Sequence, residues 1–234
     1  MKSDLRTLAL LVVCFAATSQ SPAQPLQESA WWSYRDAYRA LVRFDKLGKP
    51  KHLIQQRMQV QARTPGASTE GLRLRLQGSQ TALELPLDAA LHAQVPLLKQ
   101  AYDDNAALVL NRPPAAFGFR VRVSITPRAD GAYELSELRA ACAQVLAFQQ
   151  QVNPEHYRNK RCTGVSLAFP PGSNPAATLR QADASKPLPS ALGPLYPGES
   201  DREHPVVHLH WEPMAEGTQL RTTGVPLVVA AVIE

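Results

Sequence analysis

The sequence predicts an exported α+β protein with an antiparallel, sandwich-like β-sheet core and two flanking helices. Several short segments alternate apolar and polar residues, which is typical of antiparallel strands with one solvated face. Two longer segments instead repeat their apolar residues at helical spacing. The chain has 234 residues, of which 44% are hydrophobic and 19% are charged. This balance excludes wholesale disorder and suits one large domain or two small ones.

The first 23 residues have the pattern of a secretory signal peptide. Lys2 and Arg6 precede an apolar segment at 8–17, and small residues, Ser21 and Ala23, end the pattern. A membrane anchor would need roughly 20 apolar residues, about twice this length. We therefore expect cleavage after Ala23 and a periplasmic or secreted mature chain. Its loss removes two basic residues and one acidic residue, so the formal net charge falls from +5 to +4.

The main α+β domain is expected to span 24–169. Its first helix is predicted within 29–44, with Ser29 as the N-cap, because aromatic and aliphatic residues recur there at helical spacing. The region 55–127 then alternates with a period of two and is expected to form one antiparallel sheet, interrupted by a short helical turn. The clearest alternating segments are 57–63, 72–77, 83–87 and 117–125.

A second helix is predicted over 134–152, where the sequence Asn-Pro that follows ends the helical pattern. Cys142 lies on its apolar stripe, and Cys162 lies just before a short predicted strand. These are the two cysteines of the expected mature chain. An even pair in an oxidising compartment indicates a disulfide, which here would join the helix to the sheet.

The composition changes at 170–205, which contains eight prolines and three glycines. Because proline supplies no donor for sheet hydrogen bonds, this segment is predicted to be a linker or a surface loop. The last segment, 206–234, is expected to supply C-terminal strands that complete the sheet. Its final strand is apolar on both faces, which predicts an interior position.

The segment 83–114 carries a more specific pattern: an LPLD strand, a second Pro-Leu pair and the run NAALVLN. It resembles a pattern in uncharacterised exported β-rich envelope proteins of proteobacteria. The resemblance rests on packing and turn residues. It implies a β-rich envelope protein and carries over no catalytic residue.

A candidate metal site lies late in the chain. His208, His210 and Glu212 are two residues apart, so on a strand all three point to the same side. Two strand histidines can reach one tetrahedral zinc ion. The tetrapeptide HLHW also resembles the zinc strand of α-type carbonic anhydrases, but we reject that match. The family's third histidine comes from a later strand, and no histidine follows His210, so His204 or His156 would have to replace it. The alternative is an ordinary strand whose histidines face water.

A second candidate site is a basic face. Arginines alternate with apolar residues on several predicted strands, the main ones being Arg73, Arg75, Arg120 and Arg122. If these strands are neighbours, their guanidinium groups form one surface suited to phosphates or carboxylates. The alternative is a solvated sheet face that resists edge aggregation and needs no ligand.

These features favour an exported, non-catalytic binding or assembly module of the bacterial envelope. The expected partner is an anionic envelope polymer or another envelope protein. The alternatives are a metal-dependent enzyme or metal-binding protein that uses His208 and His210, and an inhibitor or immunity-type protein for envelope hydrolases. We expect no nucleic-acid partner, no membrane span in the mature chain, and no cofactor other than zinc at the histidines.

Overall fold

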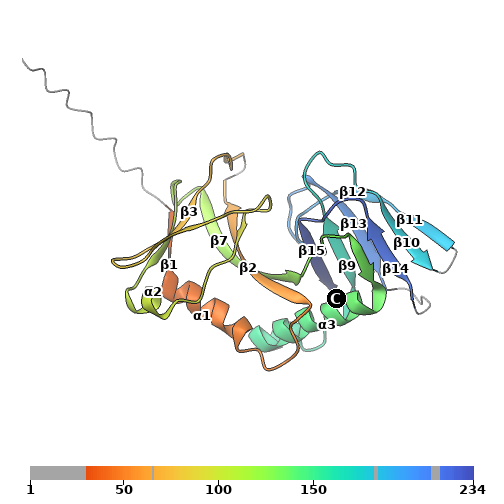
Figure 1. Cartoon of the computed structure of the whole chain (residues 1–234), viewed down its shortest axis with the longest axis horizontal. Coiled ribbons are helices and arrows are strands. Elements are labelled where there is room, and N and C mark those ends of the chain that lie inside the picture. The colour runs from red at the N-terminus through yellow and green to blue at the C-terminus, as the bar shows by residue number, and fades with distance from the viewer. Residues whose placement is uncertain (1–29, 65, 182–183, 212–216) are drawn as a thin grey trace, which may run out of the picture.

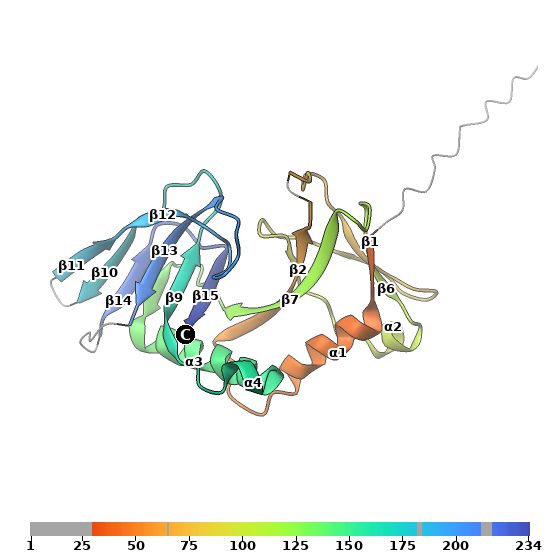
Figure 2. The same ribbon diagram turned by 180° about the vertical axis from the view of Figure 1, so that it is seen from behind.

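The computed structural model describes residues 30–64, 66–181, 184–211 and 217–234. The predicted signal peptide and its cleavage point lie outside these residues. The described chain forms an N-terminal half and a C-terminal half that stand side by side, with helices along one edge (Figures 1 and 2). Three antiparallel sheets and four helices build the two halves, which confirms the predicted α+β class.

One seven-stranded sheet runs through both halves, in the order β12-β13-β9-β15-β7-β2-β5. Its strands are β2 (Ile54–Ala62), β5 (His92–Ala93), β7 (Phe117–Ile125), β9 (Cys162–Ala168), β12 (Ser190–Gly193), β13 (His204–His210) and β15 (Val228–Ile233). The two halves meet where β15 pairs with β7, through the single register pair Val229–Ile125. The final strand, β15, lies between β9 and β7, in the interior position that its apolar sequence predicts.

The N-terminal half packs a four-stranded sheet against one face of β2 and β7. Its strand order is β1-β6-β3-β4, with the bounds β1 (Ala30–Ser33), β3 (Leu74–Gln77), β4 (Ala82–Leu85) and β6 (Ala107–Leu110). Helices α1 (Tyr34–Asp45) and α2 (Lys99–Asp103) contact each other beside it. The core between these layers includes Tyr34, Met58, Leu76 and Leu108, each fully buried.

Two predictions for this half were wrong. The first helix begins at Tyr34 rather than near Ser29, because the backbone of Ala30–Ser33 pairs with Ala107–Leu110. Ser29 lies outside the described residues. The region 55–127 also forms strands of two sheets rather than one, since β3, β4 and β6 pair among themselves and not with β2 or β7. Alternation gives the exposed face of each strand but does not specify its neighbours.

The C-terminal half packs a second four-stranded sheet and a helix against β9, β13 and β15. The sheet order is β11-β10-β14-β8, with the bounds β8 (Ala132–Glu134), β10 (Ala177–Gln181), β11 (Ala184–Leu188) and β14 (Gln219–Thr222). Helix α3 (Leu135–Val152) confirms the second predicted helix and is followed by the short α4 (Pro154–Tyr157). Leu138 and Val145 of α3 are buried beside Val165, Leu167 and Leu220 in the core of this half.

The segment 170–205 is not a linker, contrary to the sequence-based prediction. It contains β10, β11 and β12, and its residues Leu195 and Tyr196 are buried. The prolines are tolerated because they lie between strands, near the start of a strand, as Pro205 does on β13, or on an edge strand. Pro187, for example, lies on β11, the edge strand of its sheet, where one side of the backbone needs no donor.

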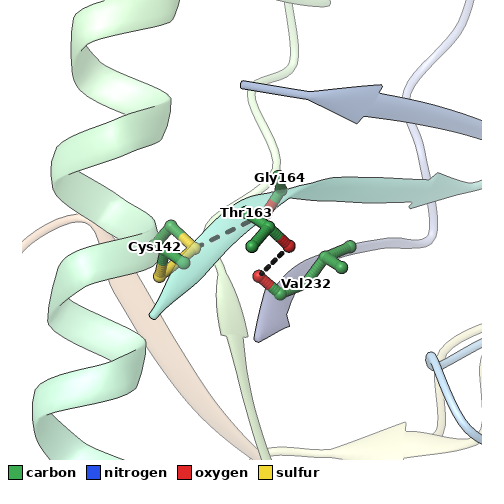
Figure 3. The surroundings of a disulfide bond; sticks show 5 residues. Cys142, Thr163, Gly164 and Val232 are labelled. Carbon is green, nitrogen blue, oxygen red and sulfur yellow. Dashed lines mark hydrogen bonds between the residues drawn. A yellow bond between two sulfur atoms is a disulfide. The ribbon is translucent and has the colours of Figure 1, made fainter. Parts of the chain in front are cut away.

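Cys142 and Cys162 form the predicted disulfide, which joins α3 to the start of β9 (Figure 3). Their Cα atoms are 6.0 Å apart, and Cys142 is fully buried. The Cys142 sulfur lies 3.5 Å from the carbonyl oxygen of Gly164, and Thr163 Oγ1 donates to the carbonyl of Val232 at 3.5 Å. The bridge therefore fixes the helix to an interior strand of the seven-stranded sheet.

Replacing both Cys142 and Cys162 by alanine should lower the free energy of unfolding by about 3 kcal/mol, because the bridge closes a loop whose entropy the unfolded chain then regains. Urea denaturation monitored by circular dichroism measures the change, and reduction of the wild-type protein should produce a similar loss. Thiol titration of the denatured, unreduced mature protein should find no free thiol. Two free thiols would contradict the bridge.

Candidate functional site

The most concentrated polar chemistry of the fold lies on one face of the seven-stranded sheet. We call this the inner face; it is the face opposite the two large cores. β2 and β7 pair along their whole length, and alternate residues of both strands point to this side. They bring together Gln55, Arg57, Gln59, Gln61, Arg120, Arg122 and Ser124. The segment between β12 and β13 descends beside them, between the two halves (Figures 1 and 2).

That segment contains a tight turn, which we call the 196–199 turn. The Glu199 N–H donates to the carbonyl of Tyr196 at 3.2 Å, and Gly198 has a φ of +85°. Proline at the second position and glycine at the third are the residues that a type II turn prefers. Because the first and last residues of such a turn are close in space, Tyr196 and Glu199 approach the sheet together.

Both side chains contact Arg122. Its Nη2 forms an ion pair with Glu199 Oε1, and its guanidinium lies 4.3 Å from the centroid of the Tyr196 ring. The same carboxylate oxygen accepts a hydrogen bond from Gln61 Nε2 at 3.0 Å and lies 3.7 Å from Arg120 Nη1. Two hydrogen-bond donors, from Arg122 and Gln61, and one further cation, Arg120, therefore converge on one oxygen atom.

Arg122 is largely buried but remains charged. Its side chain is 14% exposed, and its Nε donates to Gln59 Oε1 at 2.6 Å. Burial and the neighbouring Arg120 lower the pKa of Arg122 to about 10, although Tyr196 and Asp201 oppose the change. The guanidinium is thus a cation at neutral pH that is paired along its edge and covered on its face.

A second chain of contacts starts at the Tyr196 hydroxyl. This hydroxyl lies 3.0 Å from His92 Nε2, and His92 Nδ1 lies 3.6 Å from Asp88 Oδ2. With the imidazole proton on Nδ1, facing Asp88, Nε2 accepts a hydrogen bond from the phenol. Asp88 Oδ1 also accepts from the backbone N–H groups of Ala90 and His92, at 2.9 and 2.8 Å.

The pKa shifts of Tyr196 and Asp88 show what these hydrogen-bonded groups can do chemically. Burial raises the pKa of Tyr196, so the phenol stays protonated at neutral pH. Burial would also raise the pKa of Asp88, but the hydrogen bonds from His92 and Ala90 outweigh it and lower the pKa. The order Tyr–His–Asp resembles that of a nucleophile, its base and an orienting acid, yet an activated nucleophile needs a lowered pKa. The Tyr196–His92–Asp88 contacts instead join the C-terminal half to the N-terminal half.

The structure separates the four arginines of the predicted basic face. Arg75 lies on β3 and pairs with Glu84 at 2.5 Å, on a different sheet from Arg120 and Arg122. Arg73 directly precedes β3. Arg122 lies on the face of β7 opposite the core, as the alternation predicts, but Tyr196 and Glu199 from the predicted linker cover it. Arg57, directly opposite Arg122 in the register, is the arginine that joins the inner face.

The histidines of the predicted metal site lie on β13. His208 and His210 are exposed, and their rings are stacked with centroids 6.4 Å apart and 24° between the planes. Burial lowers the pKa of His208, and the neighbouring His210 lowers it further. Glu212 lies outside the described residues. Of the two substitutes, His204 binds the carbonyl of Phe169 through Nδ1 at 3.1 Å, and His156 lies on α4. Within the described part of the chain, no three metal-binding side chains are grouped.

Sequence reasoning missed Asp88, His92, Tyr196 and Glu199 as a group. Two of them lie in the segment predicted to be a linker, and the other two lie in a short connection with no strong periodicity. One signal was present: Tyr-Pro-Gly-Glu is the sequence of a type II turn. It predicts the turn but not the residue that the turn contacts.

Replacing Tyr196 by phenylalanine should destabilise the protein by about 1–2 kcal/mol, because it leaves the buried His92 Nε2 without its partner. The matched control is the replacement of Tyr102 by phenylalanine, since the Tyr102 hydroxyl forms no hydrogen bond among the described residues. It should change the free energy of unfolding by less than half of this amount. Urea denaturation of the two variants and the wild type measures the difference. Equal effects would show that the hydroxyl of Tyr196 contributes nothing specific.

The chain matches no protein family model, no curated protein and no solved structure. Among the described residues, no helix is long and apolar enough to cross a membrane.

Proposed function

We propose that the protein is an exported, non-catalytic binding or assembly module of the bacterial envelope that recognises anionic groups on a partner through the inner face. One observation carries the proposal. Gln61 and Arg122 donate hydrogen bonds to a single carboxylate oxygen, and the Arg120 guanidinium lies 3.7 Å from the same atom. Arginine forks and amide donors around one oxygen are the chemistry that recognises carboxylates and phosphates.

The location part of the proposal rests on the sequence and on the disulfide. The first 23 residues have the features of a secretory signal, and the Cys142–Cys162 bridge suits an oxidising compartment. In the envelope, anionic polymers and acidic protein surfaces supply the groups that the inner face would bind. An inhibitor or immunity-type role for envelope hydrolases would use the same surface and is a special case of binding.

The non-catalytic part of the proposal rests on the Tyr196–His92–Asp88 chain. These groups satisfy one another, and the pKa of the phenol is raised rather than lowered. The side chain of His92 is only 3% exposed. A base used in catalysis needs access to the proton that it removes, whereas a structural hydrogen bond is strongest when water is excluded.

A second candidate function is metal binding at His208 and His210. The stacked, nearly parallel rings bring two imidazoles to one side of β13, and the lowered pKa of His208 favours the neutral form that ligates metals. β12 pairs with β13 only from His204 to Val207, so the two histidines lie beyond the end of their neighbouring strand. Solvent or a further side chain would complete the coordination.

Replacing Arg57 and Arg120 by alanine should weaken binding of the mature protein to lipopolysaccharide and to poly-L-glutamate by about tenfold, because two phosphate- or carboxylate-binding groups are lost from the inner face. Wild-type binding should also weaken as salt rises from 50 to 300 mM. Surface plasmon resonance on the immobilised polymers measures both effects.

The matched control is the pair Arg73 and Arg75, since its replacement by alanine removes the same charge from another sheet. The affinity of this control variant for the two polymers should fall by less than threefold. Equal losses in the two variants would indicate a net-charge effect without a site. No binding by the wild type to either polymer would contradict recognition of these anions.

Zinc should bind the mature protein at pH 7.5, and replacing both His208 and His210 by alanine should abolish the uptake. Protonated imidazole cannot ligate a metal, and the pKa of His208 lies below its ordinary value of 6.5. Uptake should therefore weaken as the pH falls, because protonation of His208 removes a ligand. Isothermal titration calorimetry measures the uptake.

The control variant replaces His52 and His156, which are exposed on other parts of the fold. It should bind zinc like the wild type. Unchanged uptake after loss of His208 and His210 would leave β13 as an ordinary strand with solvated histidines.

A further inference from the structure

We propose that the 196–199 turn is an internal ligand, and that the group beneath it is a binding site for an acidic, tyrosine-containing peptide turn of a partner protein. We call this group the Arg122 site; it consists of Gln59, Gln61, His92, Arg120 and Arg122. This inference deepens the proposed function, on which it rests, by naming the peptide chemistry that the inner face recognises.

The site and its occupant come from different halves of the fold. All five residues of the Arg122 site lie on β2, β5 and β7 of the N-terminal half. The turn belongs to the C-terminal half, between β12 and β13. The site is therefore complete without the turn, and the turn meets it as a ligand from another protein would.

Side chains, rather than backbone pairing, attach the turn to the site. Within 194–203 the structure describes one backbone hydrogen bond, the turn's own, from Glu199 N to the Tyr196 carbonyl. The Leu195 N–H donates to the Asp201 side chain, at 3.4 Å. The strands on either side end at Gly193 and begin again at His204. Because the turn is no part of a sheet ladder, it can leave the site while β12 and β13 stay paired.

The contacts of the turn define the ligand. A phenol ring lies 4.3 Å over the Arg122 guanidinium, and its hydroxyl lies 3.0 Å from His92 Nε2. A carboxylate contacts Arg122, Gln61 and Arg120 at the same time. An aromatic ring over a cation and a carboxylate at its edge use two separate attractions, so a ligand needs both groups.

Packing explains why a carboxylate alone does not suffice. Tyr196 and Leu195 form a small core with Ala90, Ala168, Val206, Val228 and Ala230 on the inner face. When the turn leaves, this apolar surface is exposed, and only a ligand with an aromatic or aliphatic group covers it again. A peptide that presents a tyrosine and a glutamate three residues apart in a tight turn supplies all of these contacts.

The test uses the acetylated and amidated peptide Leu-Tyr-Pro-Gly-Glu-Ser, labelled for fluorescence anisotropy, and the full mature chain. Wild-type protein, whose site is filled, should bind it weakly. The variant Glu199→Gln with Tyr196→Ala should bind it at least tenfold more tightly. Adding Arg122→Ala to this variant, or replacing the peptide's glutamate by glutamine, should remove the gain.

The variant Glu199→Gln alone keeps the Tyr196 ring in the small core and serves where the double variant does not fold. It should bind the peptide several-fold more tightly than the wild type. If folded variants, judged by circular dichroism and an intact disulfide, bind the peptide no better than the wild type, the inference is wrong and the turn is only structural.

Binding of poly-L-glutamate by the same variants separates this outcome from failure of the proposed function. Variants that bind the polymer but not the peptide would overturn the peptide assignment and leave anion recognition in place. Failure to bind either probe would overturn both.

Discussion

A guanidinium that is largely withdrawn from water must be paired, and this constraint at Arg122 organises the inner face. Taking a cation out of water costs several kcal/mol, which only close partners offset, and removing one partner of a buried pair costs about 3–5 kcal/mol. Arg122 meets the requirement with Glu199 and Gln59 at its edge and the Tyr196 ring on its face. Since Glu199 and Tyr196 come from the other half of the chain, the same contacts also fix how the halves approach each other.

Pairing within the seven-stranded sheet contributes little to the connection between the two halves. β7 and β15 share one register pair, whereas β2 and β7 share nine. On the side of the large cores, α3 strengthens the junction: the Leu53 N–H donates to Gln144 at 3.1 Å, and Phe44 packs against Phe148. The disulfide then ties α3 to β9. The Arg122 contacts are the counterpart on the inner face, so the junction is held from both sides of the sheet.

The sequence predicted what depends on local periodicity. The alternation of β7, the helical stripe of α3 and the apolar final strand each specified an element and its buried face, because burial imposes the same period on the residues that the fold buries. It did not predict that Ala30–Ser33 would pair with β6, or that β3 and β7 would belong to different sheets, because neighbours are chosen by contacts far apart in the chain. For this reason the prediction of one basic face failed: Arg75 lies on a different sheet from Arg120 and Arg122. The Arg122 site was missed because its occupant, the 196–199 turn, lies in a segment whose prolines indicated a loop, and a loop was not expected to bury Tyr196.

A buried polar cluster can stabilise the fold and can also recognise a ligand, because both roles require partners for the same charged groups. If Arg122 served only to join the halves, an apolar residue at the same position would join them as well, since well-packed apolar residues often replace buried ion pairs without loss of stability. A cation with a convergent amide donor, Gln61, adds something that apolar packing lacks, which is selectivity for a carboxylate at one place. The turn that supplies this carboxylate is held by its side chains alone, while the strands around it are held by backbone pairing. That difference makes the turn the part of the inner face that a competing acidic ligand can replace without unfolding the sheet.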